Sequence, residues 1–285
     1  MTAALSGSSW DLKIPNRINP VFSTILKSHQ LLIMGYDHCM QKTIIVVPTY
    51  NEIDNLPALA GELWSLPIPN LKILVVDDGS PDGTGELADE MAAHKPDRMA
   101  VIHREGKQGL GTAYITGFKA ALADGADVIG QMDADFSHSP DYLPAFLELL
   151  EQTDLVIGSR YTNGGRIDER WGPGRLLLSW FGNAYARAIL HLPVQDSTGG
   201  FRLWRRETLA AMPLDSIRSN GYVFQVEMAY VAYKLGFRMQ ESPIYFIDRR
   251  IGVSKMSLRI QIEAALRVWQ VLFTHRHLKP EDRLI

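Results

Sequence analysis

Short apolar runs rich in Val and Ile alternate along the chain with segments whose apolar residues recur at helical spacing. The runs occupy residues 43–49, 71–79, 99–105, 127–135 and 154–161. Because their apolar stretches are continuous, they are typical of strands buried on both faces of a parallel sheet. The segments between them end near Gly, Pro or Asp, as helices commonly do. This alternation predicts an α/β domain whose mainly parallel, twisted sheet is flanked by helices and joined by right-handed crossovers.

The pattern changes after about residue 162, where a Gly- and Arg-rich segment begins. Helical patterns follow over 176–192 and around 221–236. A basic loop over 245–257 then precedes a last amphipathic pattern over 257–274. No internal repeat or low-complexity linker separates these parts, so the simplest organisation is one domain with C-terminal elaborations.

We expect the main domain to cover 40–256 and a C-terminal amphipathic helix and tail to cover 257–285. The first clear strand begins directly after Met40. Residues 1–39 show weak periodicity, so they are expected to be a poorly ordered extension or to lie upstream of a physiological start at Met40.

The composition narrows the class of protein. Of 285 residues, 46% are hydrophobic and 21% charged, which suffices for a large core without disulfides. The formal net charge of -3 argues against a general nucleic-acid binder, and we expect no nucleic-acid partner. Cys39 is the single cysteine, so no intrachain disulfide can form and a reducing compartment is expected. The patterns predict neither a spanning helix nor a secretory signal.

Acidic residues follow the predicted strands, at the edge where α/β sheets bind ligands. Asp77 and Asp78 end the second run, and Asp133 and Asp135 end the fourth. Alternate residues of an extended segment point the same way, so Asp133 and Asp135 are expected to face one cavity. Two carboxylates suit Mg²⁺ or Mn²⁺, which also bind substrate phosphates. A metal site is therefore favoured over a turn that only interrupts helix formation.

The first strand-to-helix turn, VVPTYNE (46–52), admits two interpretations. On its own it is a turn in which Thr49 or Asn51 caps the next helix. At a ligand edge, however, Tyr50 can stack on a base and Glu52 can accept hydrogen bonds from a base or ribose. The second turn is similar, because Asp78 or Ser80 can cap a helix while a neighbouring carboxylate accepts from a nucleoside.

Other enzyme classes are disfavoured by missing residues. Gly109 and Gly111 resemble part of a dinucleotide fingerprint, but Tyr114 occupies its third glycine position and no P-loop sequence occurs. These glycines are expected to permit a tight helix entry instead. No GxSxG sequence occurs, which argues against a serine hydrolase. His275 and His277 lie two residues apart on a predicted helix, so we expect interfacial or solvated side chains rather than metal ligands.

Cationic side chains gather in the second half of the chain. DRRIGVSK (248–255) places several donors in one Gly-containing loop, which suits phosphate. Arg160 ends GSRY, and the later loops contain Arg175, Arg202, Arg249, Arg250 and Lys255, although surface arginines are usually only solvated.

Taken in order, these motifs resemble those of the GT-A nucleotide-diphospho-sugar transferases, and more narrowly the polyprenol-phosphate (dolichol-phosphate) mannose synthases. The motifs are VVPTYNE, VVDDGSPDGT, GLGTAYITGF, MDADFSHSP, VIGSRY, DSTGGFR, GYVFQVEM and DRRIGVSK, from about Met40 to Leu278. The resemblance implies the GT-A fold, with C-terminal amphipathic helices. It also implies transfer of mannose from GDP-mannose to polyprenyl phosphate, with inversion to a β-linked product.

The resemblance further implies roles for individual residues. The guanosine part would be held by Pro48, Tyr50, Glu52, Val75 and Asp77. The metal and the diphosphate would be held by Asp133, Ala134 and Asp135, with Arg160 also on the nucleotide sugar. The acceptor phosphate would be held by Arg175, Arg249, Ser254 and Lys255, with Asp135, Arg249 and Lys255 as the catalytic residues. Ser137 stands where family members often carry Gln as a further metal ligand.

A lipid acceptor would require contact with a membrane. The expectation is peripheral association with the cytoplasmic face, with a membrane-anchoring partner protein as a further candidate. The apolar segments over 176–192 and 260–279 either lie in the headgroup plane or pack in the core. Two alternatives to the mannosyltransferase are a polyprenyl-phosphate glucosyltransferase, or another glycosyltransferase on the same fold, and a non-catalytic nucleotide-sugar-binding subunit.

Overall fold

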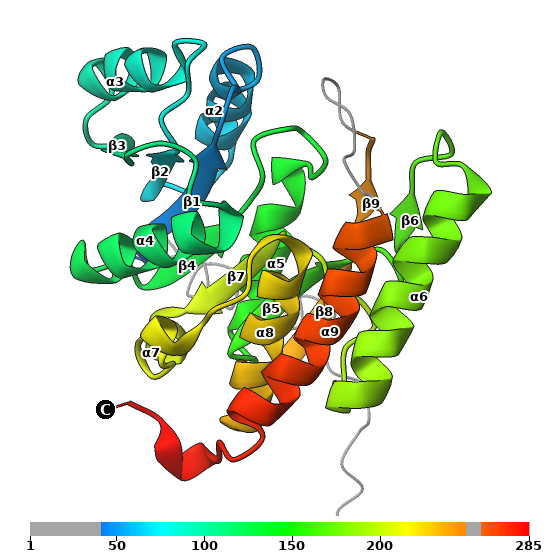
Figure 1. The fold of residues 1–285 in the computed structure, drawn as a ribbon. Helices are drawn as coiled ribbons and strands as arrows, with labels where there is room; N and C mark the ends of the chain where they lie inside the picture. Colours follow the sequence, from blue (N-terminus) through cyan, green and yellow to red (C-terminus); the bar gives the residue numbers. More distant parts are fainter. Residues whose placement is uncertain (1–40, 249–257, 285) are drawn as a thin grey trace, which may run out of the picture. The chain divides into compact units, whose positions relative to one another are not determined.

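The computed structural model describes residues 41–248 and 258–284 (Figure 1). By its contacts the chain separates into Met1–Met40 and Gln41–Ile285, and all described residues belong to the second unit. The expected extension over 1–39 therefore lies outside the described residues. So do Arg249, Arg250, Ser254 and Lys255, whose expected roles stay predictions.

Seven strands form the central sheet in the order β3-β2-β1-β4-β7-β5-β8. Their bounds are β1 Thr43–Thr49, β2 Leu71–Asp77, β3 Met99–His103, β4 Val128–Gln131, β5 Leu155–Ser159, β7 Arg202–Arg205 and β8 Met239–Pro243. Neighbouring strands are parallel except at β7, which runs antiparallel to both β4 and β5. The predicted mainly parallel α/β sheet is confirmed, with one reversed strand inserted.

Helices cover both faces of this sheet (Figure 1). They are α2 Leu56–Ser65, α3 Thr84–His94, α4 Leu110–Ala123, α5 Leu143–Leu150, α6 Pro173–Leu190, α7 Arg206–Ala210, α8 Gly221–Lys234 and α9 Leu258–His275. Three 3₁₀ turns are η1 Pro140–Tyr142, η2 Leu214–Ser216 and η3 Pro280–Asp282.

Alternate residues of the strands feed two separate core clusters. Ile45 and Val47 of β1 pack on one face with α2 and α5. Ile44 and Val46 pack on the other face with α4 and α8. Because strand side chains alternate in direction, a continuous apolar run is what burial on both faces requires.

Helix α4 approaches the sheet closely at Gly117. A Cβ atom at this position would lie 2.3 Å from Cγ1 of Val46 in β1, so only glycine allows this docking depth. The same helix begins at a positive-φ glycine, Gly109 (φ +102), as the expected tight entry requires. The docked helix carries Tyr114 to the carboxyl end of the sheet.

The strands end earlier than the apolar runs suggested. Strand β2 stops at Asp77 and β4 stops at Gln131, so Asp133 lies past the end of the strand and Asp135 lies in the turn that follows. Phe136 in this turn has φ +59, an uncommon value for a residue with a Cβ atom. The expectation that strand alternation aligns the two carboxylates is therefore wrong, because the turn positions them.

The C-terminal part adds a small second sheet and a helix pair. Strand β6, Arg166–Ile167, pairs in parallel with β9, Tyr245–Phe246. Helices α6 and α9 lie side by side (Figure 1). Helix α9 also packs on α8, where Nε2 of His275 lies 2.7 Å from Oε1 of Glu227, and both side chains are buried. His275 was expected at an interface or in solvent, and the structure corrects this to a buried partner of Glu227.

Candidate functional site

Two carboxylates lie at the carboxyl end of β4, each fixed by a donor. The Tyr114 hydroxyl donates to Oδ1 of Asp133 over 2.9 Å, and the Ser137 amide donates to Oδ1 of Asp135 over 3.0 Å. The backbone at Gly200 closes in on the first acid, because a Cβ atom there would lie 3.3 Å from Oδ2 of Asp133. The orientation of these acids is thus set by a helix, a turn and a glycine loop.

The turn that carries the acids is anchored on its far side by β9 and the loop after it. The Ile247 amide donates to the Ser137 carbonyl over 3.2 Å. His138 is buried, with its ring centroid 5.4 Å from that of Phe201 and 5.2 Å from that of Phe246. These contacts allow the turn to hold its positive-φ residue, Phe136, in place.

Burial shapes the protonation of two groups beside the acids. Burial and then the charge of Asp133 raise the pKa of Tyr114 well above its ordinary value of 10, so its hydroxyl stays a donor. Burial lowers the pKa of His138 below its usual 6.5, and this outweighs the opposite effect of Asp133 and Asp135. His138 is therefore neutral at pH 7, and within the described residues its Nδ1 has no hydrogen-bond partner.

The donor set of the acid pair fits a hard divalent cation. Asp133 and Asp135 offer carboxylate oxygens, whereas no group of three or more His, Cys, Asp or Glu side chains in the described parts of the chain could hold a metal. Mg²⁺ is commonly bound by one or two carboxylates, with waters and substrate phosphates completing its shell. Ser137 is buried beside them and contributes its amide to Asp135.

The ends of β1 and β2 form the adjoining part of this edge. Asp77 is buried, and its carboxylate accepts from Oγ1 of Thr49 over 2.9 Å and from the amide of Ser80 over 2.9 Å. Asp78 pairs with Arg104 over 2.5 Å, with side chains only 8% and 6% exposed. Neither Asp78 nor Ser80 caps the next helix, as had been considered, because α3 begins after Gly83 without a side-chain cap.

The predicted base-binding residues of the first turn lie at the same edge. Pro48 lies in β1, two residues after Val46. The pairing of β1 with β4 ends at Val46. Tyr50 is half-buried, and Nζ of Lys107 lies 3.9 Å from its ring centroid. Oε2 of Glu52 accepts from the side-chain amide of Asn55 over 2.8 Å. The contact with Lys107 places a positive charge on one face of the Tyr50 ring, which is the ring predicted to stack on a base.

Val75 lies apart from this edge. It is fully buried in the core within β2, two residues before the strand ends, so its side chain supports the strand. Ala134 is buried between the two acids in the turn.

Arg160 and Asp196 form a buried bidentate ion pair. Nε of Arg160 donates to Oδ2 of Asp196 and Nη2 donates to Oδ1, both over 2.7 Å. Nη2 also donates to the Thr198 hydroxyl over 2.7 Å. Burial alone would raise the pKa of Asp196, but Arg160 outweighs it and holds that pKa below its ordinary value. The expected sugar-binding arginine is thus engaged with the loop that precedes β7.

Arg202, one of the cations noted in the second half of the chain, is fully buried in the structure. Its fully buried guanidinium donates to the carbonyls of Ser197, Gly199 and Gln225 over 2.8–2.9 Å. Burial lowers its pKa to about 10. Arg202 therefore ties the loop before β7 to α8 and presents no side-chain donors to solvent.

Arg175 lies on the first turn of α6 with its guanidinium held on two sides. Its guanidinium carbon lies 3.6 Å from the ring centroid of Trp171, and Nη1 lies 2.9 Å from Oδ1 of Asp248. About a third of the Arg175 side chain is exposed (34%), so the guanidinium remains accessible. Of the four predicted acceptor-phosphate residues, the described parts of the chain include only this one.

Sequence reasoning missed several residues of this region. Tyr114 departs from the glycine fingerprint, and its place in the first turns of a helix at the ligand edge could have indicated a donor toward the acids. Asp248 is the first residue of the predicted basic segment DRRIGVSK, and the sequence pattern gives it no role. The contact of Asp196 with Arg160 joins residues 36 positions apart and carries no local signal, whereas Trp171 lies only four positions before Arg175 and could have been noticed as its neighbour.

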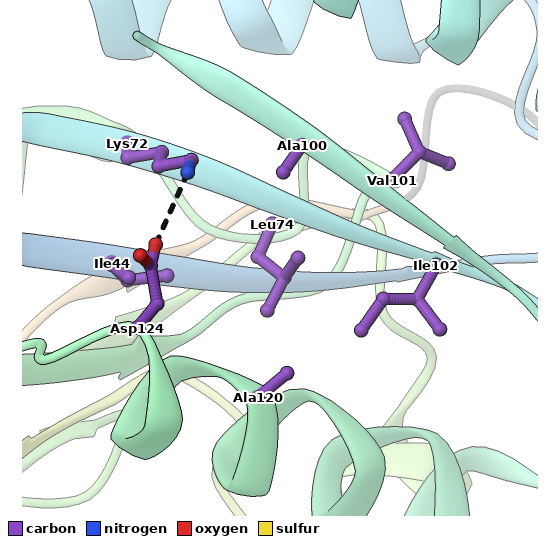
Figure 2. A pocket seen from close by; sticks show the side chains of 8 residues that line it. All are labelled: Ile44, Lys72, Leu74, Ala100, Val101, Ile102, Ala120 and Asp124. Atoms are coloured by element: carbon purple, nitrogen blue, oxygen red, sulfur yellow. Dashed lines mark hydrogen bonds and ion pairs between the residues drawn. The ribbon is translucent and has the colours of Figure 1, made fainter. Parts of the chain in front are cut away.

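A cavity between α4 and the sheet extends from the amino ends of β1 and β2 along β3 to Ile102 (Figure 2). Its volume is about 230 Å³, and its lining includes the second residues of three parallel strands, Ile44, Lys72 and Ala100. Lys72 forms an ion pair of 3.1 Å with Asp124 there. This cavity is separate from the acid pair, because neither Asp133 nor Asp135 lines it.

Comparison with known proteins adds independent findings. Residues 44–212 match the family model described as glycosyl transferase family 2. An undecaprenyl-phosphate mannosyltransferase from Micrococcus luteus is 47% identical over 80% of this chain and 92% of its own length. A polyprenol monophosphomannose synthase from Mycolicibacterium smegmatis is 47% identical over 76% of this chain and 82% of its own length.

Two solved structures are similar in fold. A mannosyltransferase from Pyrobaculum calidifontis, in complex with GDP-Man and Mn²⁺, has a TM-score of 0.58 at 16% identity, covering 92% of this chain and 75% of that chain. A glucosyl-3-phosphoglycerate synthase from Mycobacterium tuberculosis, in complex with Mg²⁺ and UDP, has a TM-score of 0.59 at 18% identity, covering 86% and 83%. At these identities the likeness supports the fold alone.

Proposed function

The chain belongs to glycosyl transferase family 2, and from this premise we propose that it transfers mannose from GDP-mannose to polyprenyl phosphate. The observation that carries the proposal is the acid pair Asp133 and Asp135, oriented at the carboxyl end of β4 by Tyr114 and Ser137. The two relatives at 47% identity, whose names specify mannosyl transfer to polyprenol phosphates, support the choice of sugar and acceptor.

In this proposal the acid pair holds a divalent cation, Mg²⁺ or Mn²⁺. When bound, such an ion neutralises negative charge on the diphosphate leaving group. Tyr114 would keep Asp133 turned toward the ion, because its hydroxyl stays protonated and can only donate to the carboxylate. Neutral His138 would add no competing positive charge beside the site.

The acceptor supplies its own nucleophile. A phosphate monoester has a second pKa near 6, so its oxygen is largely ionised at pH 7 and needs no general base. That oxygen forms a bond to the anomeric carbon of mannose while the bond from this carbon to the GDP oxygen breaks, its electron pair leaving with GDP. Attack from the opposite side inverts the anomeric centre and gives β-linked polyprenyl mannosyl phosphate.

Among the residues that the structure describes, Arg175 is the cation proposed to bind the acceptor phosphate. Its guanidinium is stacked on Trp171 and oriented by Asp248, which leaves a planar donor set suited to a phosphate. Arg249, Ser254 and Lys255 are proposed to complete the acceptor site. Two anions approach each other in this reaction, so positioned cations contribute by orientation and by charge stabilisation.

A donor panel tests the proposal. Purified protein would be incubated with GDP-mannose or UDP-glucose, polyprenyl phosphate, and Mg²⁺, Mn²⁺ or EDTA, and the lipid product followed by mass spectrometry. We expect metal-dependent transfer from GDP-mannose. Preference for UDP-glucose would identify a polyprenyl-phosphate glucosyltransferase instead. Absence of turnover with any donor would favour a non-catalytic nucleotide-sugar-binding subunit.

A further inference from the structure

A chain of buried side-chain hydrogen bonds links β7, β4 and α8 next to the acid pair. Nε1 of Trp204 donates to Oε1 of Gln131 over 3.0 Å, and Nε2 of Gln131 donates to Oε1 of Gln225 over 2.7 Å. All three residues are at most 2% exposed. Gln225 belongs to the GYVFQVEM segment (221–228), to which the proposed function assigns no role.

This chain has a fixed direction because it starts at an indole. An indole N–H can only donate, so Gln131 must turn its carbonyl oxygen toward Trp204 and its N–H groups toward Gln225. Gln225 must then turn Oε1 toward Gln131, which directs its own N–H groups away from the chain. Nη1 of Arg202 donates to the backbone carbonyl of Gln225 over 2.9 Å, so β7 also fixes the backbone of α8 at this residue.

The nitrogen end of the Gln225 amide lies beside Asp133. A Cβ atom at Gly200 would lie 3.3 Å from Oδ2 of Asp133 and 3.6 Å from Nε2 of Gln225, so both atoms border the same point. Among the described residues Nε2 has no acceptor, and it is not one of their fully enclosed polar atoms without a partner. It therefore keeps contact with solvent, and water satisfies it until a ligand oxygen takes that place.

The chemistry of this nitrogen selects an oxygen acceptor. The NH₂ group carries two donors and no lone pair for a cation, so Gln225 in this orientation is not a further metal ligand. In the proposed reaction the divalent cation meets the charge of the diphosphate. A neutral donor suits a hydroxyl group, because precisely placed uncharged donors fix the orientation of a ligand without adding charge.

The order of the strands places this donor on the sugar side of the acids. The nucleoside is expected at the ends of β1 and β2, and the acids follow β4. Strand β7 is the next neighbour of β4, and because it is antiparallel its first residues meet the carboxyl end of β4. Gly200 stands two residues before β7. A nucleotide sugar that extends from β1 across Asp133 would therefore bring its sugar to Gly200 and Gln225.

We propose that Gln225 is a sugar-binding residue, whose Nε2 donates a hydrogen bond to a hydroxyl group of the transferred sugar. This inference rests on the proposed function, because that function places a nucleotide sugar at the acid pair. Trp204 and Gln131 are positioning residues in this scheme, since they act only by fixing the direction of the Gln225 amide.

Binding of GDP and GDP-mannose to the variant Gln225→Met tests the assignment. Met keeps the length of the side chain and removes both N–H donors. Calorimetric titration in Mg²⁺ should show affinity for GDP-mannose lowered by about ten-fold and affinity for GDP unchanged within about two-fold, because only the sugar loses a partner. Gln240→Met, the same change at an exposed position of β8, is the control. If circular dichroism shows that Gln225→Met is unfolded, Gln225→Ala replaces it, because Ala favours a helix and leaves room for water beside Gln131.

Deoxy donors identify the contact in a second way. Analogues of GDP-mannose that each lack one sugar hydroxyl would be titrated into wild-type protein and Gln225→Met. One analogue should bind wild-type protein about ten-fold more weakly than GDP-mannose and lose nothing further in the variant, because its missing hydroxyl is the partner of the amide. Losses that simply add for every analogue would overturn the contact.

The outcomes separate the contact from the proposed reaction. Equal weakening of GDP and GDP-mannose by Gln225→Met would place Gln225 on the diphosphate or on the acids, and unchanged binding of both would give it no ligand; either result overturns the inference. Wild-type protein that binds GDP-mannose but transfers it to no acceptor would end the proposed function, while the titrations still decide the role of Gln225. Wild-type protein that binds no GDP-mannose would overturn both.

The titrations use the full chain and need no lipid. Within residues 41–248 and 258–284, no helix is long and apolar enough to cross a bilayer.

Discussion

The hydroxyl of Tyr114 lies 2.9 Å from Oδ1 of Asp133, so a side chain of α4 holds the first acid of the β4 turn. Tyr114 is fully buried, and its raised pKa keeps the proton on the tyrosine. Helix α4 follows β3, whereas Asp133 follows β4. The contact therefore links a helix and a turn that follow two different strands, which are separated in the sheet by β2 and β1.

Replacing Tyr114 by Phe should weaken metal binding more than folding. Phe fills the same space in the core but removes the donor that orients Asp133. Loss of a group that orients a metal ligand typically lowers metal affinity by about 10–100-fold. Transfer activity titrated with Mg²⁺ or Mn²⁺ should show the half-saturating concentration rising by that factor. Tyr230→Phe, another buried tyrosine, is the control. Equal metal titrations for both variants would contradict the role of Tyr114.

Asp135→Asn should abolish measurable transfer while preserving the fold. Asn keeps the shape and an acceptor for the Ser137 amide but lacks the negative charge that a hard cation requires. We expect turnover to fall by about 100-fold or more, as when a main electrostatic element of an active site is lost. Asp141→Asn tests the same chemical change six residues away, at an exposed position. Near-normal turnover of Asp135→Asn would remove the acid pair from the proposed reaction.

Arg175→Lys should raise KM for the acceptor with little effect on KM for the donor. Lysine keeps the charge but loses the planar contact with Trp171 and the paired donors of guanidinium. A loss of about 1.4 kcal/mol in acceptor binding corresponds to a ten-fold rise in KM. Steady-state kinetics with a soluble acceptor measure it, with Arg187→Lys on the same helix as control. A change confined to the donor would place Arg175 on the nucleotide sugar instead.

The buried pair of Glu227 and His275 should make part of the stability depend on pH. Burial by itself would raise the pKa of Glu227, but hydrogen bonds from His275 and Ser219 hold it below the ordinary 4.5. A lowered folded-state pKa stabilises the protein above pH 4.5, and this contribution disappears as the pH falls through the folded-state value. The stability gap between wild type and Glu227→Gln should therefore be largest above pH 4.5, at about 1–3 kcal/mol, and shrink toward pH 3.

Urea unfolding at several pH values measures this gap directly. Glu263→Gln on α9 is the control, because Glu263 is exposed and its change should be small and nearly independent of pH. A Glu227→Gln gap that stays constant from pH 6 to pH 3 would show that ionised Glu227 does not stabilise the α8–α9 contact.

Local sequence signals were sufficient for the sheet and for the position of the acids. Ile44 and Ile45 face opposite core clusters, so an apolar run at this point could only belong to a strand buried on both sides. The rule that ligands bind beyond strand ends then located Asp133 and Asp135 at the correct edge. The turn geometry was not predictable, because the turn that holds Phe136 at positive φ is bonded to the loop after β9, more than 100 residues later in the chain.

Pairings of distant residues account for what the sequence could not indicate. Arg160 pairs with Asp196, 36 positions away in the sequence, and Glu227 pairs with His275, 48 positions away. Both pairs are buried. Before folding, a charged residue in a loop or a helix gives no sign of such a partner. The sequence therefore gives no sign that Arg160 and Arg202 hold the loop that precedes β7, as they do in the structure.

The reversed strand β7 has a consequence for synthesis on the ribosome. Strand β4 is made about 70 residues before β7, yet β7 is its neighbour in the sheet on the side away from β1. A nascent chain that ends before residue 202 therefore presents one edge of β4 unpaired, although β1, β2 and β3 have already emerged. Open strand edges invite pairing with other chains. We expect chains truncated between α5 and β7 to aggregate. In full-length chains, the turn that carries Asp133 and Asp135 should reach its final packing only after β7 has joined the sheet.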